Sequence, residues 1–268
     1  MYAPYLNQFI QPDTIVPDPY QPMDWNKYLY VRDNPINFTD PSGHCSGNPQ
    51  DQFNPDIACW RTLERIQANY VSLTIDSKNW TNDELLIFED ALGGILHVFG
   101  GNSTTFSTAI GNWTVKRRHW GLSLWTCGIG CTFYPTRSIT LYDGIFSGDS
   151  GVAKFDIVHE FGHAFDANEN INTPKSLGEF RDKFWPGCFR FFTKGLPFGP
   201  NFEGIQGSPA SERAKVNSSE DFAETFAVYV WMQNDWGFES DIWRSVTIPD
   251  NDRLQYMEDL IATYNSAR

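Results

Sequence analysis

The pentapeptide H-E-F-G-H at residues 159–163 constrains this chain more than any other feature. Residues four apart lie on one face of an α-helix, so His159 and His163 can bind one metal ion together. The surrounding residues are mostly apolar, which predicts a buried helix that begins at the polar start signal of residues 148–150. Buried histidine is costly without a partner, and a metal ion is such a partner. The alternative is a surface helix with two solvated histidines, which the apolar context disfavours.

Glu160 directly follows the first histidine, and we expect a different role for it. In an H-E-x-x-H motif this glutamate takes a proton from a water molecule beside the metal and does not bind the metal itself. The motif is typical of zinc peptidases. Catalytic zinc usually has three protein ligands, so another part of the chain must supply the third.

A second helix supplies candidates for the third ligand. Residues 219–227 read S-E-D-F-A-E-T-F-A, with apolar residues at helical spacing and Ser218 or Ser219 as a cap. Glu220 and Glu224 share one face, so one can bind the metal while the other accepts the ring N–H of a ligating histidine. Asp221 is rotated by about 100° from Glu220 and cannot point at the same ion equally well. Taken alone, the segment also fits a helix with a solvated acidic first turn.

The two helices resemble the catalytic domain of the anthrax lethal factor family and, more distantly, the thermolysin-like gluzincins. The resemblance rests on residues 159–166 and 220–224 and covers about residues 138–232. It implies an α+β, zincin-like metallopeptidase with a small antiparallel or mixed sheet. It also implies that a strand before the metal-binding helix, here residues 138–142, is an exposed edge that pairs with an extended substrate.

The same resemblance implies roles for single residues. Zn²⁺ would be bound by His159, His163 and Glu220, with Glu160 as the general base. Glu224 would brace a ligating histidine, and we count Asp166 as a further supporting residue.

One position departs from the family pattern. The family tends to carry a tyrosine seven residues before the ligand glutamate, where it stabilises the oxyanion, and this chain has Arg213 there. Arg213 could act as a cationic electrophile in its place. The role could instead fall to Tyr229 or Tyr142, or to no residue, in which case the chain is a zinc-binding module without catalysis.

The first 43 residues have a different pattern. Eight prolines precede residue 50, and short aromatic segments lie between them, so this part cannot form a core alone. Three sequence elements follow one another here, at residues 11–19, 25–35 and 37–44. In this succession they resemble the last repeat of an RHS/YD-repeat core. An ordinary proline-rich linker is the alternative. We expect an RHS tail at residues 1–43, a linker at 44–58 and a metallopeptidase domain at 59–268.

In RHS proteins the repeats form a shell around the domain that follows, which is usually a toxin. The resemblance therefore implies an effector of a larger bacterial protein, secreted or delivered to a target cell, with a protein or peptide substrate and an immunity protein as partners. A surface-binding RHS/YD protein is the alternative. A net charge of −13 argues against nucleic-acid binding. The sequence has no signal-peptide pattern and no apolar stretch of membrane-spanning length.

Further elements follow from periodicity and turn signals. We expect helices at residues 59–70, 81–98 and 250–264, an antiparallel sheet within 113–143 and a loop at 186–217. The basic residues 116–119 read as a solvated strand edge. The cysteines allow several states. Cys127 and Cys131 could form a disulfide or, with His119, a second metal site. Cys45 and Cys59 could also form a disulfide, which leaves Cys188 without a cysteine partner.

Overall fold

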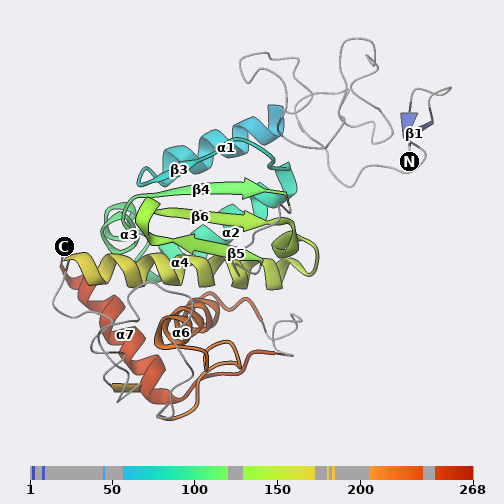
Figure 1. Ribbon diagram of the computed structural model, residues 1–268. Coiled ribbons are helices and arrows are strands. Elements are labelled where there is room, and N and C mark those ends of the chain that lie inside the picture. The colour runs from blue at the N-terminus through green and yellow to red at the C-terminus, as the bar shows by residue number, and fades with distance from the viewer. Residues whose placement is uncertain are drawn as a thin grey trace.

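The computed structural model describes residues 2–3, 8–9, 45, 57–119, 129–172, 180, 183–184, 206–237 and 245–267. They form an α+β structure (Figure 1). The elements in chain order are β1 (Tyr2–Ala3), β2 (Gln8–Phe9), α1 (Ile57–Asn69), β3 (Leu73–Ile75), α2 (Asn82–Val98), α3 (Ser103–Ile110), β4 (Trp113–Arg118), β5 (Gly130–Phe133), η3 (Tyr134–Thr136), β6 (Ser138–Tyr142), η4 (Asp143–Phe146), α4 (Ser150–Asn172), α6 (Ser218–Gln233) and α7 (Asn251–Ser266).

The main sheet is mixed. Its strand order is β3-β4-β6-β5; β4 pairs in parallel with β3 and β6, whereas β5 pairs antiparallel with β6. The expectation of an antiparallel sheet is therefore correct for β5 and β6 and wrong for β4 and β6. The short η3 turn folds β5 and β6 into a hairpin, and it is the second strand of this hairpin that pairs with β4.

The strand order also corrects the expectation for residues 138–142. These residues form β6, which lies between β4 and β5 and is not an edge strand. Instead β5 ends the strand order and lies beside α4 (Figure 1). The edge next to the helix of the H-E-F-G-H motif is thus one strand earlier in the sequence than expected.

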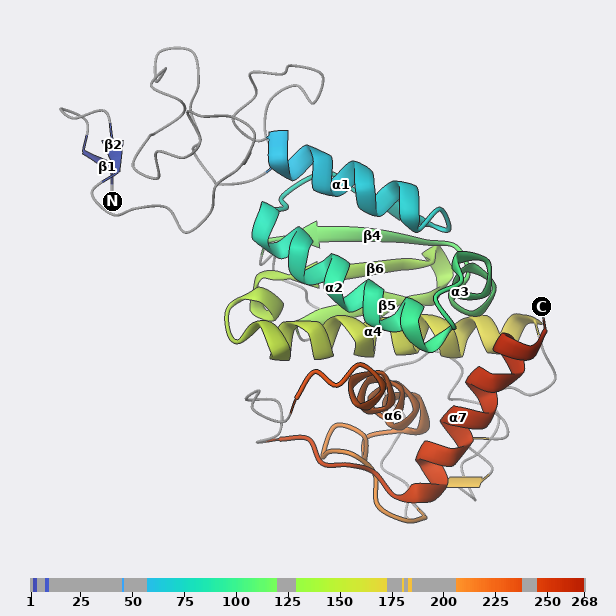
Figure 2. The ribbon, with the colours of Figure 1, turned by 180° about the vertical axis from the view of Figure 1, so that it is seen from behind.

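Helix α4 lies at the centre of the described structure, between α2 on one side and α6 on the other (Figure 2). It approaches α6 closely at Gly162, the fourth residue of the H-E-F-G-H motif. A Cβ atom there would lie 2.8 Å from Cα of Ala223 on α6. Around this crossing, Phe165 packs on Phe222 and Phe226 with ring centroids 5.4–5.8 Å apart. Small residues at the crossing and aromatic residues around it hold the two helices together.

The helix expected at residues 81–98 is confirmed, together with its capping box. The Thr81 hydroxyl accepts from the backbone N–H of Glu84, and the Glu84 carboxylate accepts from that of Thr81. Glu84 also pairs with Arg117 at 2.7 Å, as does Asp143. The expected solvated edge at residues 116–119 is therefore wrong for Arg117, which is buried because β4 is an interior strand.

The structure resolves part of the cysteine pairing. Cys45 and Cys59 form a disulfide. Cys131 is also disulfide-bonded, to a residue outside the described part, where Cys127 and Cys188 lie. A disulfide sulfur is not a thiolate ligand, so the suggested metal site with His119 is wrong; His119 faces Asp143 at 3.1 Å instead.

The C-terminal helix α7 is fastened to α6 by a buried ion pair. Its N-cap, Asp250, accepts from the backbone N–H of Arg253. The Arg253 guanidinium then reaches Asp221 on α6, with nitrogen–oxygen distances of 2.8–3.1 Å, and both side chains are fully buried. Asp221 therefore points away from the face of α6 that carries Glu220 and Glu224, as its rotation around the helix predicts. Among the described helices, none combines the length and apolarity needed to cross a membrane.

Replacing Asp221 with asparagine should destabilise the fold strongly. The change leaves Asp250 as the remaining acidic partner of the buried Arg253, and removal of one partner from a buried ion pair costs up to about 3–5 kcal/mol of unfolding free energy. Urea unfolding of the purified protein measures this cost. The exposed Asp259 on α7 gives a matched control, since Asp259→Asn should change stability by less than about 0.5 kcal/mol. Equal stability of the two variants would contradict a supporting role for the buried pair.

Candidate metal centre

The centre is built from two adjacent helices. His159, Glu160 and His163 come from the middle of α4, where each is buried. Glu220 comes from the first turn of α6. That helix is capped by Asn217, whose side chain accepts from the backbone N–H groups of Ser219 and Glu220, so the serine caps expected from the sequence are wrong. Capping fixes the first turn and with it the direction of Glu220.

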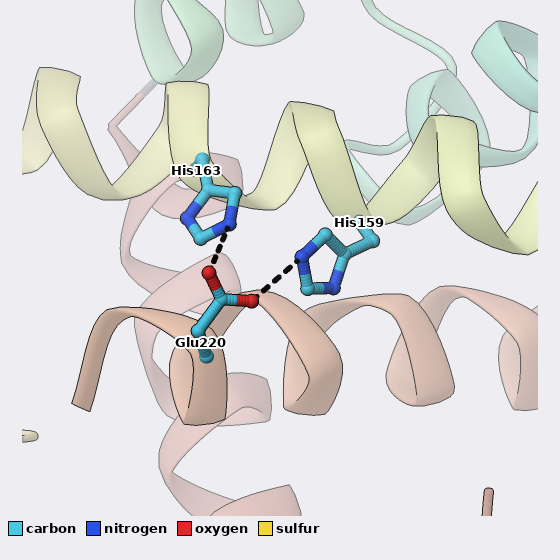
Figure 3. Close-up of side chains that lie close together, drawn as sticks. All are labelled: His159, His163 and Glu220. Atoms are coloured by element: carbon cyan, nitrogen blue, oxygen red, sulfur yellow. Dashed lines mark ion pairs between the residues drawn. The ribbon is translucent and has the colours of Figure 1, made fainter. Parts of the chain in front are cut away.

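The side chains of His159, His163 and Glu220 converge (Figure 3). Nε2 of His159 lies 3.2 Å from one Glu220 oxygen, and Nε2 of His163 lies 3.6 Å from the other. Zinc bonds to nitrogen and oxygen are about 2.0–2.2 Å long, which places neighbouring atoms of a tetrahedral set roughly 3.3–3.6 Å apart. The observed spacing fits a metal ion of this size without rearrangement of the helices.

The hydrogen bonding of His159 also fits a metal ligand. The imidazole is fully buried, yet neither ring nitrogen has a hydrogen bond of good geometry to a described residue. Buried polar atoms are rarely left in this state. A metal ion bound between Nε2 of His159 and Glu220 would supply a partner for that nitrogen.

Electrostatics couple these groups. Burial and the charge of Arg213 lower the pKa of His159, but the carboxylates of Glu220 and Glu224 outweigh them and raise it to about 9. For Glu220 burial acts in the opposite direction and raises the pKa. Hydrogen bonds from His159 and His163 outweigh burial and hold the pKa of Glu220 well below its usual range. Without a metal, Glu220 is therefore ionised and His159 is protonated. A bound metal cation can take the place of the proton on His159.

Each histidine also has a partner on its second nitrogen. Nδ1 of His159 lies 3.3 Å from Glu224 on α6. Nδ1 of His163 lies 3.2 Å from the Ser219 hydroxyl, which in turn donates to Asp166 at 3.0 Å. The contact with Ser219 favours the N–H of His163 on Nδ1, and Glu224 lies on the Nδ1 side of His159, so that Nε2 of each ring faces Glu220. Glu224 thus lies next to His159, and Asp166 is linked to His163 through the Ser219 hydroxyl.

Glu160 lies beside His159, His163 and Glu220 but makes a different set of contacts. The hydroxyl of Thr132 on β5 donates to its carboxylate at 2.7 Å. A Cβ atom at Gly130, two residues earlier, would lie 2.6 Å from the other carboxylate oxygen. Glycine at this position therefore allows the carboxylate to lie against the strand. The edge strand fixes Glu160 in place.

Arg213 is the cation that the structure adds to this centre. Its Nε donates to Glu220 at 3.0 Å, and its terminal nitrogens lie 3.6 Å from Glu160 and 3.8 Å from Asp156. Burial raises the pKa of Asp156 to about 6, against the opposing effect of Arg213. Three carboxylates from two helices thus share one guanidinium.

The other proposed electrophiles lie elsewhere. Tyr229, on α6, is half-buried, and burial together with the negative charge of Glu258 on α7 raises its pKa. Neither its hydroxyl nor that of Tyr142 hydrogen-bonds to a described residue of the centre. Tyr134 was missed by sequence reasoning; its hydroxyl lies 3.3 Å from Ser219 and 3.5 Å from His163. Thr132 was missed as well, because only the pairing of β5 beside α4 brings it to Glu160.

Comparison with protein-family models, with curated proteins and with solved structures found no match to this chain.

Zinc affinity should depend on these residues in a fixed order. Glu220→Ala removes a ligand atom and should abolish binding in the submicromolar range. Ser219→Ala and Glu224→Gln remove only the partner of a ligand, and we expect losses of roughly 10- to 100-fold. Titration against a chromophoric chelator measures all three. An equal or larger loss for Glu224→Gln than for Glu220→Ala would show that the two glutamates have been assigned the wrong way round.

Zinc uptake should also release protons. At about pH 7.5 His159 is protonated in the metal-free protein because its pKa lies near 9, and zinc binds only neutral imidazole. Uptake at this pH should therefore release about one proton from His159, and apparent affinity should rise with pH until about 9. Calorimetry in buffers of different ionisation enthalpy counts the protons. Zinc binding without proton release would contradict the raised pKa.

Proposed function

We propose that this chain is a zinc-dependent endopeptidase with a zincin-like fold. The observation that carries the proposal is that three side chains of α4 and α6 converge, while a fourth, Glu160, makes separate contacts beside them. The ligand atoms of His159, His163 and Glu220 converge within 4.8 Å of one another, while Glu160 lies beside them in contacts with Thr132 and Arg213. Three ligands plus a separate carboxylate is the donor set that metal-assisted hydrolysis requires.

The mechanism divides between the ion and the chain. A bound zinc ion would acidify a water molecule and polarise the scissile carbonyl. Glu160 takes a proton from the attacking water, whose oxygen bonds to the carbonyl carbon, and passes a proton to the leaving amine as the carbon–nitrogen bond breaks. Thr132 holds the Glu160 carboxylate in one orientation, and the helix partners Glu224 and Ser219 hold the two ligand histidines.

The strand β5 is the proposed site of substrate binding. It ends the strand order of the sheet, and its residues Gly130 and Thr132 contact the general base. An extended peptide can add to such an edge through main-chain hydrogen bonds, which places a peptide bond beside Glu160. This binding mode supports a protein or peptide substrate cleaved within its chain.

We also propose that the domain is the effector of an RHS-type bacterial protein. The supporting residues, 1–43 and the linker at 44–58, lie almost wholly outside the described part, so the proposal rests on their sequence pattern. The disulfide between Cys45 and Cys59 and the bonded state of Cys131 support an oxidising compartment, as in a secreted or delivered protein. An immunity protein in the producing cell would be the expected partner.

Glu160→Gln tests the proposed chemistry. The variant should keep zinc, because Glu160 is no ligand, and should lose roughly 10²- to 10⁴-fold of peptidase activity. Metal analysis and proteome-wide cleavage profiling of wild type and variant measure both properties. Glu64→Gln, on the exposed side of α1, is the matched control and should behave as wild type.

Two results would contradict the assignment. Loss of zinc from Glu160→Gln would make Glu160 a ligand. A wild-type protein that binds zinc and cleaves nothing would favour the zinc-binding module without catalysis.

A further inference from the structure

Strand β5 makes the contacts that hold the proposed general base. The Thr132 hydroxyl donates to the carboxylate of Glu160 at 2.7 Å and lies 3.0 Å from the main-chain carbonyl oxygen of the same residue. The backbone at Gly130 is so close to Glu160 that a Cβ atom there would lie 2.6 Å from a carboxylate oxygen. Both contacts depend on the position of β5 beside α4, so the support of β5 is also the support of Glu160.

The sheet alone supports β5 weakly. The strand has four residues, begins with glycine and, within the described part of the chain, pairs with β6 alone. A glycine in a strand has no side chain to pack and loses more conformational freedom on folding than other residues. The last residue of the strand, Phe133, is 51% exposed. Segments with few buried apolar contacts open locally at low cost.

Cys131 gives this strand a covalent support. It lies between Gly130 and Thr132, and its sulfur is disulfide-bonded to a residue outside the described part. Because side chains alternate along a strand, Cys131 points to the face of the sheet opposite to that of its two neighbours, away from Glu160. The disulfide therefore holds the strand from behind and does not enter the centre.

The two described disulfide positions lie at opposite edges of the sheet. The bond between Cys45 and Cys59 fastens residue 45 to α1, which contacts β3 (Figure 1). Strand β3 is at one end of the strand order, and β5, with Cys131, is at the other. Of these two bonds, the one at Cys131 is thus the one that adjoins the contacts of Glu160.

The proposed metal ligands do not depend on β5. His159 and His163 belong to α4 and Glu220 to α6, and these helices pack directly on each other. Loss of the disulfide at Cys131 should therefore release Glu160 and leave the metal in place. This difference distinguishes the support of one catalytic group from the support of the whole fold.

We propose that Cys131 is a positioning residue for Glu160: its disulfide keeps β5 against α4, and efficient peptide cleavage requires the intact bond. The inference rests on the proposed function and deepens it. Reduction by a dithiol breaks the sulfur–sulfur bond, leaves two thiols on the chain and converts the dithiol to its own disulfide. Because the cytosol keeps such bonds reduced, the substrates of this peptidase are then proteins of an oxidising compartment.

The test compares three forms of the zinc-loaded full chain: the oxidised wild type, the wild type after reduction with dithiothreitol and alkylation of its thiols, and Cys131→Ser. The double variant Cys45→Ser/Cys59→Ser is the matched control, because it removes a disulfide at the opposite edge of the sheet. Three quantities are measured: zinc affinity, amide hydrogen exchange at residues 130–133, and kcat for a peptide identified by cleavage profiling.

In Cys131→Ser and in the reduced protein, the amides of β5 should exchange roughly 10-fold faster or more. The kcat should fall roughly 10- to 100-fold, because a displaced Glu160 no longer lies in line with the attacking water. Zinc affinity should stay within about threefold of wild type, since the ligands and their partners on α6 are unchanged. The control should keep the kcat and the β5 exchange of the oxidised wild type.

The partner of Cys131 gives a second variant with the same expected effect. Peptide mapping of the oxidised protein identifies this partner among Cys127 and Cys188. Replacing the partner with serine should reproduce the loss in Cys131→Ser, and replacing the other cysteine should not.

Unchanged exchange and unchanged kcat in Cys131→Ser and in the reduced protein would overturn the role. Loss of zinc, or unfolding of the whole domain on reduction, would also overturn it, because the disulfide would then support the fold in general. An oxidised wild type that binds zinc and cleaves no peptide would overturn the proposed function and this role with it. The exchange of the β5 amides distinguishes that case from a disulfide that does not order the strand.

Discussion

The close crossing of α4 and α6 is the constraint on which the rest of the structure depends. The two histidines and Glu160 belong to one helix and Glu220 to the other, so the centre exists only where the helices nearly touch. Gly162 makes that approach possible, because any larger side chain would meet the backbone at Ala223. The α7 helix then supports α6 from behind, through the fully buried pair of Asp221 and Arg253. Neighbouring carboxylates of one turn thus serve separate purposes, Glu220 in the centre and Asp221 in the fold.

Charge balance explains why so many polar groups can be buried together. Asp156, Glu160, Glu220 and Glu224 bring four carboxylates into a small volume, and Arg213 is the cation that contacts three of them. The raised pKa of His159, which the carboxylates of Glu220 and Glu224 cause against burial and Arg213, expresses the same excess of negative charge. A divalent cation bound by His159, His163 and Glu220 would relieve that excess. The same argument explains why Arg213 can lie next to this group: its charge balances the carboxylates.

Local features of the fold were predictable from sequence, and the pairing of distant segments was not. The capping box at Thr81 and the H-E-x-x-H face depend on residues a few positions apart, so the sequence reveals them, whereas the cap of α6 at Asn217 was placed one or two residues too late. The position of β5 at the end of the sheet depends on which strand of a hairpin meets β4, and no local pattern encodes that choice. For this reason Glu220 and Glu224 could be selected from their helix, while Thr132 and Tyr134 could not. Arg117 was misread for the same reason, since burial of a basic residue depends on Glu84 and Asp143 far away in the chain.

The central claim is that one metal ion joins α4 to α6, and crystallography of the zinc-loaded protein at the zinc absorption edge tests it most directly. The account predicts one strong anomalous peak, with Nε2 of His159, Nε2 of His163 and an oxygen of Glu220 each about 2.0–2.2 Å away, and Glu224 on Nδ1 of His159. A peak coordinated by Glu224 in place of Glu220, or zinc bound elsewhere on the chain, would contradict it.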